Sequence, residues 1–361
     1  TDADTAITLI TRDGGENYSK PMISTGFTKK FEPDQLAIQT AENMSDNLGV
    51  TVRTRTEVAL LDTASSAVVL TSGERVPYSS LVLTLGAELI RPPMGGDATD
   101  EVMGVNDLDD YRRFRDTLVQ TGATKVAVIG AGLIGCEFTN DLLNGDFTVE
   151  AVDPMDYCLP TLLPKTAGLA VQQALEEKGA HFHFGSFATD VNRSESGYTV
   201  ALNNGETIQS DAVLSAVGVR PRTQLAADAG IECGRGIKTD RYLRTSVKNV
   251  YAIGDCAEVE GHVLVYVAPL MAAARALAAT LTGTPTKVAY PAMPVTIKTP
   301  ACPVCVSPVA GDAEGKWSIE ADGRDVKALF RNPEGDLLGF ALTGQAVKQR
   351  MPLTKQLPAI L

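Results

Sequence analysis

Three glycines and one aspartate, spaced as in a nucleotide-binding loop, are the residues of this sequence best suited to chemistry. Residues 125–129 (KVAVI) form an apolar run typical of a strand buried on both faces. The run leads into the G-x-G-x-x-G motif of Gly130, Gly132 and Gly135, then a helical pattern, then a second strand that ends at Asp153. Together these parts predict a βαβ unit that binds a dinucleotide pyrophosphate. A packed glycine-rich turn without a ligand is the alternative interpretation.

Each of these residue types has a physical reason to stand where it does. Gly130 permits a tight strand-to-helix turn, Gly132 lets the backbone approach the pyrophosphate, and Gly135 lets helix and strand pack closely. Asp153 follows Gly130 by 23 residues, where a carboxylate can accept hydrogen bonds from an adenosine ribose. Because it would also repel a 2′-phosphate, we expect NADH to be preferred over NADPH.

A second candidate site is Gly254-Asp255, which ends the apolar run Asn249–Ile253. Gly254 allows close approach of the backbone, and Asp255 can accept hydrogen bonds from the hydroxyls of a polyol chain. Residues 263–281 then alternate small and apolar side chains, which predicts a packed helix whose beginning could face a ligand. A surface turn is the alternative interpretation of the Gly-Asp pair.

The motif Cys302-Pro-Val-Cys305 is a possible redox dithiol. It follows a strand and a pair of prolines instead of opening a helix, and no Lys or Arg lies between its cysteines. A zinc site would need a second pair of ligands, and the sequence offers none. We therefore predict structural thiols and no metal, with a disulfide reductase as the competing hypothesis.

Composition excludes several classes of function. The 361 residues are 44% hydrophobic, enough for two or three domains with sizeable cores, and the net charge of −12 argues against nucleic acid as a partner. The apolar stretch 263–281 contains Pro269 and Arg275, so no membrane span is expected. The six cysteines form no regular disulfide framework, which fits a cytoplasmic protein.

An internal repeat indicates two dinucleotide-binding units in one chain. Leu70–Ala87 and Leu202–Val219 align without gaps at an offset of 132 residues, and both predict strand, tight turn, strand and an apolar strand ending in Gly. Generic hairpin chemistry is the alternative interpretation. The same offset places a twin of the glycine motif at or before residue 1, so we expect the first βα unit to be absent. The opening strand, Thr5–Thr11, is expected to be buried.

With these residues placed, the chain resembles the FAD-dependent pyridine-nucleotide oxidoreductases, and within them the bacterial NADH:rubredoxin reductases. The motifs that carry the resemblance run along essentially the whole sequence: RDGGENYSKPMISTGF, LVLTLGAELIRPP, VAVIGAGLIGCEFTNDL, LSAVGVRPRT, YAIGDCAEVEG, YVAPLMAAARALA and MPVTIKTPACPV.

The resemblance implies an α/β fold with two Rossmann-like three-layer dinucleotide-binding domains and a small C-terminal α/β domain. Residues 1–106 and 240–302 would form the FAD-binding domain, without its first βα unit. Residues 107–239 would form the NAD-binding domain, and residues 303–361 the C-terminal domain.

The resemblance also implies the residues that hold the cofactors. FAD would be held by Lys20, Val58, Glu137, Asp255, Val267 and Lys298, and NADH by Gly130, Gly132, Gly135, Asp153 and Gly218. Lys20 would approach the flavin ring, and Glu137 would pair with Lys20, so these two are the predicted catalytic residues. A plain Glu–Lys surface pair is the alternative interpretation.

The implied reaction passes a hydride from NADH to FAD and then single electrons to rubredoxin or a similar small one-electron carrier. Two hypotheses compete with it: disulfide reduction at Cys302 and Cys305, and an NAD-binding module without flavin chemistry. The negative net charge disfavours broad attraction to an acidic carrier, so docking would depend on a local patch. The sequence locates neither that patch nor the oligomeric state.

Overall fold

In the computed structural model, which describes residues 5–361, the two copies of the repeat adopt the same local structure. In the first copy, β6 (Ala67–Leu70) turns into β7 (Arg75–Pro77); in the second, β14 (Gly197–Leu202) turns into β15 (Thr207–Ser210). Both turns place a glycine at positive φ, 84° and 88°. Each then leads to a parallel strand, β8 (Leu81–Leu83) or β16 (Ala212–Ser215). The repeat is therefore structural, as predicted.

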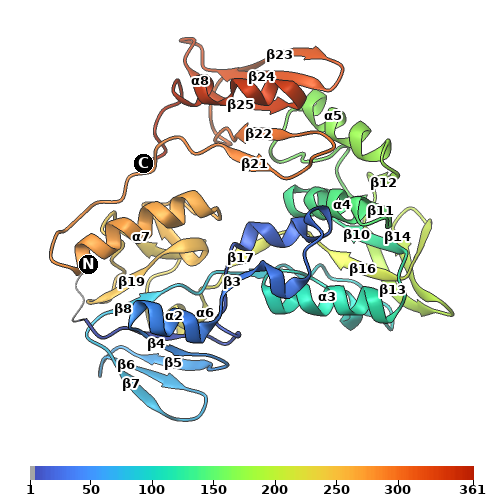
Figure 1. Ribbon diagram of the computed structural model, residues 1–361. Coiled ribbons are helices and arrows are strands. Elements are labelled where there is room, and N and C mark those ends of the chain that lie inside the picture. Colours follow the sequence, from blue (N-terminus) through green and yellow to red (C-terminus); the bar gives the residue numbers. More distant parts are fainter. Residues whose placement is uncertain (1–4) are drawn as a thin grey trace.

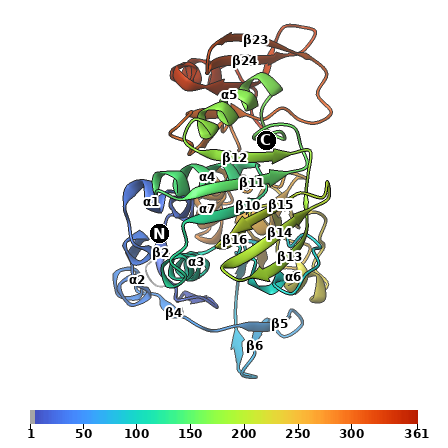
Figure 2. The same ribbon diagram turned by 90° about the vertical axis from the view of Figure 1, so that its right-hand side faces the viewer.

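The second copy belongs to a complete three-layer unit (Figures 1 and 2). Its central parallel sheet has the order β12-β11-β10-β16, and β13-β14-β15 form an antiparallel sheet. Side chains of α3 and α4 share a core with one face of the parallel sheet, and the antiparallel sheet shares a core with the other face. The other strands of this unit are β10 (Lys125–Ile129), β11 (Thr148–Asp153), β12 (Ala180–Phe184), β13 (Ala188–Ser194) and β17 (Val219–Pro221). Its helices are α3 (Leu108–Gln120), α4 (Leu133–Asn144) and α5 (Lys165–Glu176), whereas α6 (Gln224–Asp228) packs in the core of the first unit.

The first copy belongs to a unit built from two separate parts of the chain, and one core joins residues of both parts. Three parallel strand pairs, β1–β4, β8–β19 and β18–β20, accompany the sheet β5-β6-β7. The remaining strands are β1 (Thr8–Ile10), β2 (Asn17–Tyr18), β3 (Ala37–Gln39), β4 (Thr51–Arg53), β5 (Val58–Asp62), β9 (Ala87–Leu89), β18 (Ile237–Thr239), β19 (Val250–Ala252) and β20 (Ala257–Val259). The helices are η1 (Lys20–Thr25), α1 (Gly26–Lys29), η2 (Pro33–Leu36), α2 (Ala41–Leu48), η4 (Gly254–Cys256) and α7 (Val267–Leu281). A further short helix, η3 (Thr99–Glu101), packs against the middle unit, where its Glu101 carboxylate accepts a hydrogen bond from Tyr198 of β14.

The prediction that the opening strand is buried is wrong. The strand β1 pairs with β4 along one edge. The side chains of Ile7 and Leu9 are 53% and 43% exposed. An apolar, β-branched run predicts a strand but not the neighbours that would cover it.

The C-terminal unit is a five-stranded antiparallel sheet with the order β21-β22-β25-β24-β23, at the top of Figure 1. Its elements are β21 (Val295–Ile297), β22 (Val304–Ser307), β23 (Lys316–Asp322), β24 (Asp325–Arg331), β25 (Leu337–Thr343), η5 (Gly344–Gln349) and α8 (Arg350–Thr354). One face shares a core with α5 of the middle unit, and the other is covered by η5 and α8.

The predicted domain limits remain a proposal, and strand pairing moves one of them, the limit between the FAD-binding and C-terminal domains. Strand β21, which we assigned to the FAD-binding domain, pairs with β22 and so belongs to the C-terminal sheet. The antiparallel pair β9–β17 links the first two units. Residues 1–4 of the predicted first domain lie outside the described part. Within residues 5–361, no helix combines the length and apolar character that crossing a bilayer requires.

Candidate functional site

The glycine loop has the geometry that its sequence predicts. Gly130 follows β10 with φ 108°, and a Cβ there would lie 2.7 Å from the carbonyl oxygen of Ala216. A Cβ on Gly135 would lie 1.9 Å from the carbonyl oxygen of Gly130, so only glycine fits this contact between helix and strand. A Cβ on Gly132, which caps α4, would meet open space. Gly130 and Gly135 are therefore required by packing, whereas the space beside Gly132 is free for a ligand.

Asp153 holds this loop in place, a role that sequence reasoning missed. Its Oδ2 accepts a hydrogen bond from Ala131 N at 2.7 Å, and its Oδ1 accepts one from Met155 N at 2.9 Å. The residue is only 8% exposed. Strand β16 runs beside β10, and the chain after it brings Val217 next to Gly130. The predicted Gly218 is the next residue after Val217 and so lies near the glycine loop. Gly218 itself has φ 115°.

Glu137 is the centre of a buried hydrogen-bond network that joins all three units. It lies on α4 and is 1% exposed. Its Oε2 accepts hydrogen bonds from Lys298 Nζ at 2.5 Å and from Ser24 Oγ at 2.6 Å, and its Oε1 accepts one from Lys298 N at 2.9 Å. Ser24 comes from η1, and Lys298 directly follows β21. The network can hold the Lys298 ammonium in one orientation.

The predicted pairing of Glu137 with Lys20 is wrong. Both oxygens of the Glu137 carboxylate are taken by Lys298 and Ser24, while Lys20 lies in the electrostatic field of Asp255. Sequence reasoning named Glu137 and Lys298 separately, but it could not choose between two lysines that the chain brings in from opposite ends.

Two further polar residues of α4 connect the middle unit to the other two units by hydrogen bonds. The carboxylate of Asp141 accepts hydrogen bonds from Thr28 N at 2.7 Å and Phe27 N at 3.1 Å, and Asn140 Oδ1 accepts one from Ala301 N at 3.0 Å. Burial raises the pKa of Asp141, which these hydrogen bonds only partly offset. The signal was in the sequence: Glu137, Asn140 and Asp141 are polar residues on a helix that also carries many apolar residues. Such residues are buried only with partners.

Lys20 and Asp255 face each other without forming an ion pair. Burial raises the pKa of Asp255, and the nearby Lys20 ammonium acts in the opposite direction. Lys20 keeps contact with solvent, but the protein around it lowers the pKa of its ammonium. Within residues 5–361, the Asp255 carboxylate has no hydrogen-bond donor. A half-buried acceptor without a donor fits the hydroxyls of a polyol such as the ribityl chain of FAD.

The other two predicted FAD residues lie on elements of the first unit. Val267 is the first residue of α7 and is 47% exposed, as expected for a side chain at a ligand-facing helix end. Val58 begins β5 opposite Leu70 and packs against the core of the unit. The residues present therefore have the chemistry that FAD binding requires. They supply the acceptor of Asp255, the ammonium of Lys20, the apolar side chain of Val267 and the ordered ammonium of Lys298.

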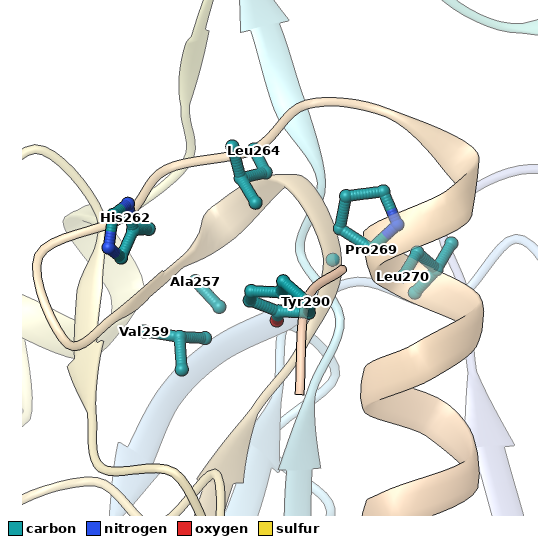
Figure 3. A pocket seen from close by; sticks show the side chains of 8 residues that line it. Ala257, Val259, His262, Leu264, Pro269, Leu270 and Tyr290 are labelled. Atoms are coloured by element: carbon teal, nitrogen blue, oxygen red, sulfur yellow. The ribbon is translucent and has the colours of Figure 1, made fainter. Parts of the chain in front are cut away.

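A small pocket lies beside the beginning of α7 (Figure 3). Tyr290 stands between Ala257 and Val259 on one side and Pro269 and Leu270 on the other. The pocket includes Gly254 in its lining but none of the six predicted FAD residues. We interpret it as a packing gap between α7 and β20.

The two cysteines of the C-x-x-C motif point into different cores. Cys302 packs with the face of the sheet that meets α5, and Cys305 with the face that η5 and α8 cover. Both are free thiols, and burial raises the pKa of each. A redox dithiol needs an accessible thiolate, so this geometry does not support the disulfide reductase hypothesis. Among the described residues, no three His, Cys, Asp or Glu side chains form a possible metal site.

Comparison with known proteins decides the family. A family model described as pyridine nucleotide-disulphide oxidoreductase matches residues 2–278. The chain belongs to this family. A second model, described as a rubredoxin binding C-terminal domain, matches residues 287–357. These matches confirm the predicted family and fold class, and the second one begins before β21, in agreement with its place in the C-terminal sheet.

Individual relatives are similar along nearly the whole chain. The rubredoxin-NAD(+) reductase of Alcanivorax borkumensis is 53% identical over 100% of this chain and 94% of its own length. The nitric oxide reductase FlRd-NAD(+) reductase of Aliivibrio fischeri is 34% identical over 99% of this chain and 93% of its own. The structure of the NADH:rubredoxin oxidoreductase of Clostridium acetobutylicum superposes with a TM-score of 0.80 at 19% identity, covering 97% of this chain and 88% of that one. This last similarity shows the fold alone.

Proposed function

We propose that this protein passes electrons from NADH through FAD to a rubredoxin. The observation that carries the proposal is the union, in one chain, of the pyridine-nucleotide oxidoreductase unit with a rubredoxin binding C-terminal domain. The 53% identity to a rubredoxin-NAD(+) reductase supports the same acceptor. The six cysteines are all free, which supports the reducing environment of the cytoplasm as the location.

In this proposal NADH lies over the glycine loop. The N–H groups at the beginning of α4 bind its pyrophosphate, close to open space at Gly132. Asp153 fixes the loop through Ala131 N and accepts hydrogen bonds from the adenosine ribose with its remaining lone pairs. Gly130, Gly135 and Gly218 supply the close backbone contacts around the same cofactor.

FAD, when bound, supplies the chemistry of taking a hydride and releasing electrons singly. Asp255 accepts hydrogen bonds from its ribityl hydroxyls, and Val58 and Val267 provide contacts at its two ends. Glu137 orients the Lys298 ammonium through two hydrogen bonds to the same residue. Lys20 and Lys298 favour negative charge on the cofactor. No protein nucleophile or general base is needed.

The test is reduction of a rubredoxin by NADH with the FAD-loaded chain under anaerobic conditions. The proposal expects rubredoxin bleaching that requires both NADH and FAD, and no NADH-dependent reduction of small disulfides. Reduction of a disulfide without reduction of rubredoxin would support the competing hypothesis. A purified chain that binds NADH but takes up no FAD would support the NAD-binding module.

A further inference from the structure

The end of the chain carries a charge opposite to that of the whole molecule. Residues 337–361 contain Lys348, Arg350 and Lys355 and no Asp or Glu, whereas the net charge of the chain is −12. All three cations lie on or directly after η5 and α8. A local positive surface on a strongly negative protein is the kind of feature that directs an acidic partner to one place.

The segment has an inner and an outer side. Ala346 and Leu353 are buried and share a core with Phe340 and Leu342 of β25. The three cations are exposed, and so is Met351, at 60%. The inner contacts fix the segment on the sheet, so its exposed side chains form an ordered surface of three cations and one apolar side chain. We call Lys348, Arg350, Met351 and Lys355 the basic patch.

The charges of the basic patch are not neutralised by any residue that the structure describes. Within residues 5–361, none of the three forms an ion pair, although other cations of the same unit do: Lys327 pairs with Glu320, and Arg324 with Glu177. The acid that touches the segment is Asp325, whose Oδ1 accepts a hydrogen bond from Gln345 N at the beginning of η5. Three exposed, unpaired cations would gain most from carboxylates supplied by another molecule.

The position of the basic patch relates it to the redox site. It lies on the face of the C-terminal sheet opposite to α5, so the middle unit does not cover it. Arg350 is close enough to Cys305 of β22 to act on that thiol electrostatically. Cys305 is paired with Thr296 of β21, and β21 leads directly to Lys298. The basic patch thus adjoins the strand pair that carries the Lys298 ammonium.

We propose that the basic patch is the docking surface for an acidic face of the one-electron carrier. This inference rests on the proposed function and deepens it, because it assigns the local surface that a negatively charged reductase needs to attract an acidic acceptor. Lys348, Arg350 and Lys355 attract and orient carboxylates of the carrier, and Met351 gives the contact an apolar centre.

The test compares two triple variants with the same change in charge. The patch variant is Lys348→Glu, Arg350→Glu and Lys355→Glu. The control variant is Lys238→Glu, Lys248→Glu and Lys316→Glu, three exposed lysines that form no ion pair among the described residues and lie outside the patch. Both are loaded with FAD, and the KM for a recombinant rubredoxin is measured at low salt. Reduction of 1,4-benzoquinone, an uncharged acceptor, reports the integrity of the NADH half-reaction.

We expect the patch variant to raise the KM for rubredoxin by about tenfold, the control variant by less than about twofold, and neither to slow benzoquinone reduction. Equal KM values for the two variants would overturn the docking surface. If the patch variant does not fold, the parent protein decides, because a KM that does not rise with NaCl would also overturn it. A parent protein that reduces benzoquinone but not rubredoxin would instead contradict the proposed function.

Discussion

The Nζ of Lys298 lies 2.5 Å from Oε2 of Glu137, although 161 residues separate them in the chain. One partner stands on the helix that begins at the glycine loop, and the other stands at the end of β21 in the C-terminal sheet. The pair therefore ties the nucleotide-binding unit to the unit that matches a rubredoxin binding domain. It holds the Lys298 ammonium in a fixed orientation where the two units meet.

The first prediction concerns how much the Glu137–Lys298 pair stabilises the fold. Glu137→Gln leaves the Lys298 ammonium, 26% exposed, without its carboxylate, and we expect a loss of about 3 kcal/mol in the free energy of unfolding. Glu320→Gln, which breaks the solvent-exposed pair with Lys327, is the matched control and is expected to cost less than about 1 kcal/mol. Urea unfolding measures both. Equal losses would show that the Glu137 pair is no stronger than a surface contact.

The second prediction separates two glycines of one motif. Gly135→Ala forces a Cβ against the carbonyl oxygen of Gly130, so we expect it to destabilise the fold by about 3 kcal/mol. Gly132→Ala meets open space, so its unfolding free energy should change by less than about 1 kcal/mol while the Kd for NADH rises about tenfold. Thermal unfolding and NADH titration distinguish the two. A Gly132→Ala variant with unchanged NADH affinity would contradict the placement of the pyrophosphate.

The third prediction tests the preference for NADH. Asp153→Asn keeps one acceptor for the loop but removes the charge that repels a 2′-phosphate. We expect the ratio of the Kd for NADPH to the Kd for NADH to fall about tenfold, together with some loss of affinity for both as the hydrogen bond to Ala131 N weakens. Titration of each nucleotide gives the ratio. If the ratio stays constant, Asp153 serves the loop alone.

The fourth prediction follows from the burial of the two C-x-x-C thiols. The double variant Cys302→Ala and Cys305→Ala removes small buried groups from two cores, so it should lower the melting temperature slightly. Its kcat for rubredoxin should stay within about twofold of the parent, because neither thiol is an accessible thiolate. Loss of rubredoxin reduction in a variant that still folds would revive the dithiol hypothesis.

The fifth prediction concerns pH. Burial raises the pKa of Glu150, but hydrogen bonds from Lys125 and His183 outweigh it and hold the pKa below its ordinary value of 4.5. A carboxyl group whose pKa is lowered by folding stabilises the protein above its unfolded pKa, and this contribution disappears as the pH falls through the folded pKa. Glu150→Gln should therefore cost about 1 kcal/mol at pH 7 and less below pH 4.5. Urea unfolding at the two pH values measures the difference. A loss independent of pH would indicate packing rather than charge.

Local rules predicted the parts of the molecule that short segments determine. The glycine loop needs Gly130 because of its positive φ and Gly135 because of a contact within one βα turn, and the repeat turns need Gly73 and Gly205 because of positive φ. These features depend on neighbours in the sequence. A motif therefore identifies them without knowledge of the tertiary fold.

The partner of Glu137 depends on contacts that no local rule contains. Lys20 and Lys298 have the same charge and side chain, and only the tertiary fold decides which of them reaches the carboxylate. The exposure of Leu9 and the unpaired cations of the basic patch likewise depend on which residues the tertiary fold places next to them. Sequence reasoning named Glu137 and both lysines but not the pairing between them, and it did not locate the basic patch.

Electron flow from NADH through FAD to rubredoxin is tested most directly by the visible spectrum of the FAD-loaded chain. The spectrum is recorded without oxygen after addition of NADH and again after addition of oxidised rubredoxin. We expect NADH to bleach the flavin band and rubredoxin to restore it while its own absorption disappears, with two rubredoxins reduced for each NADH consumed. A flavin band that NADH does not bleach, or that stays bleached in the presence of oxidised rubredoxin, would contradict it.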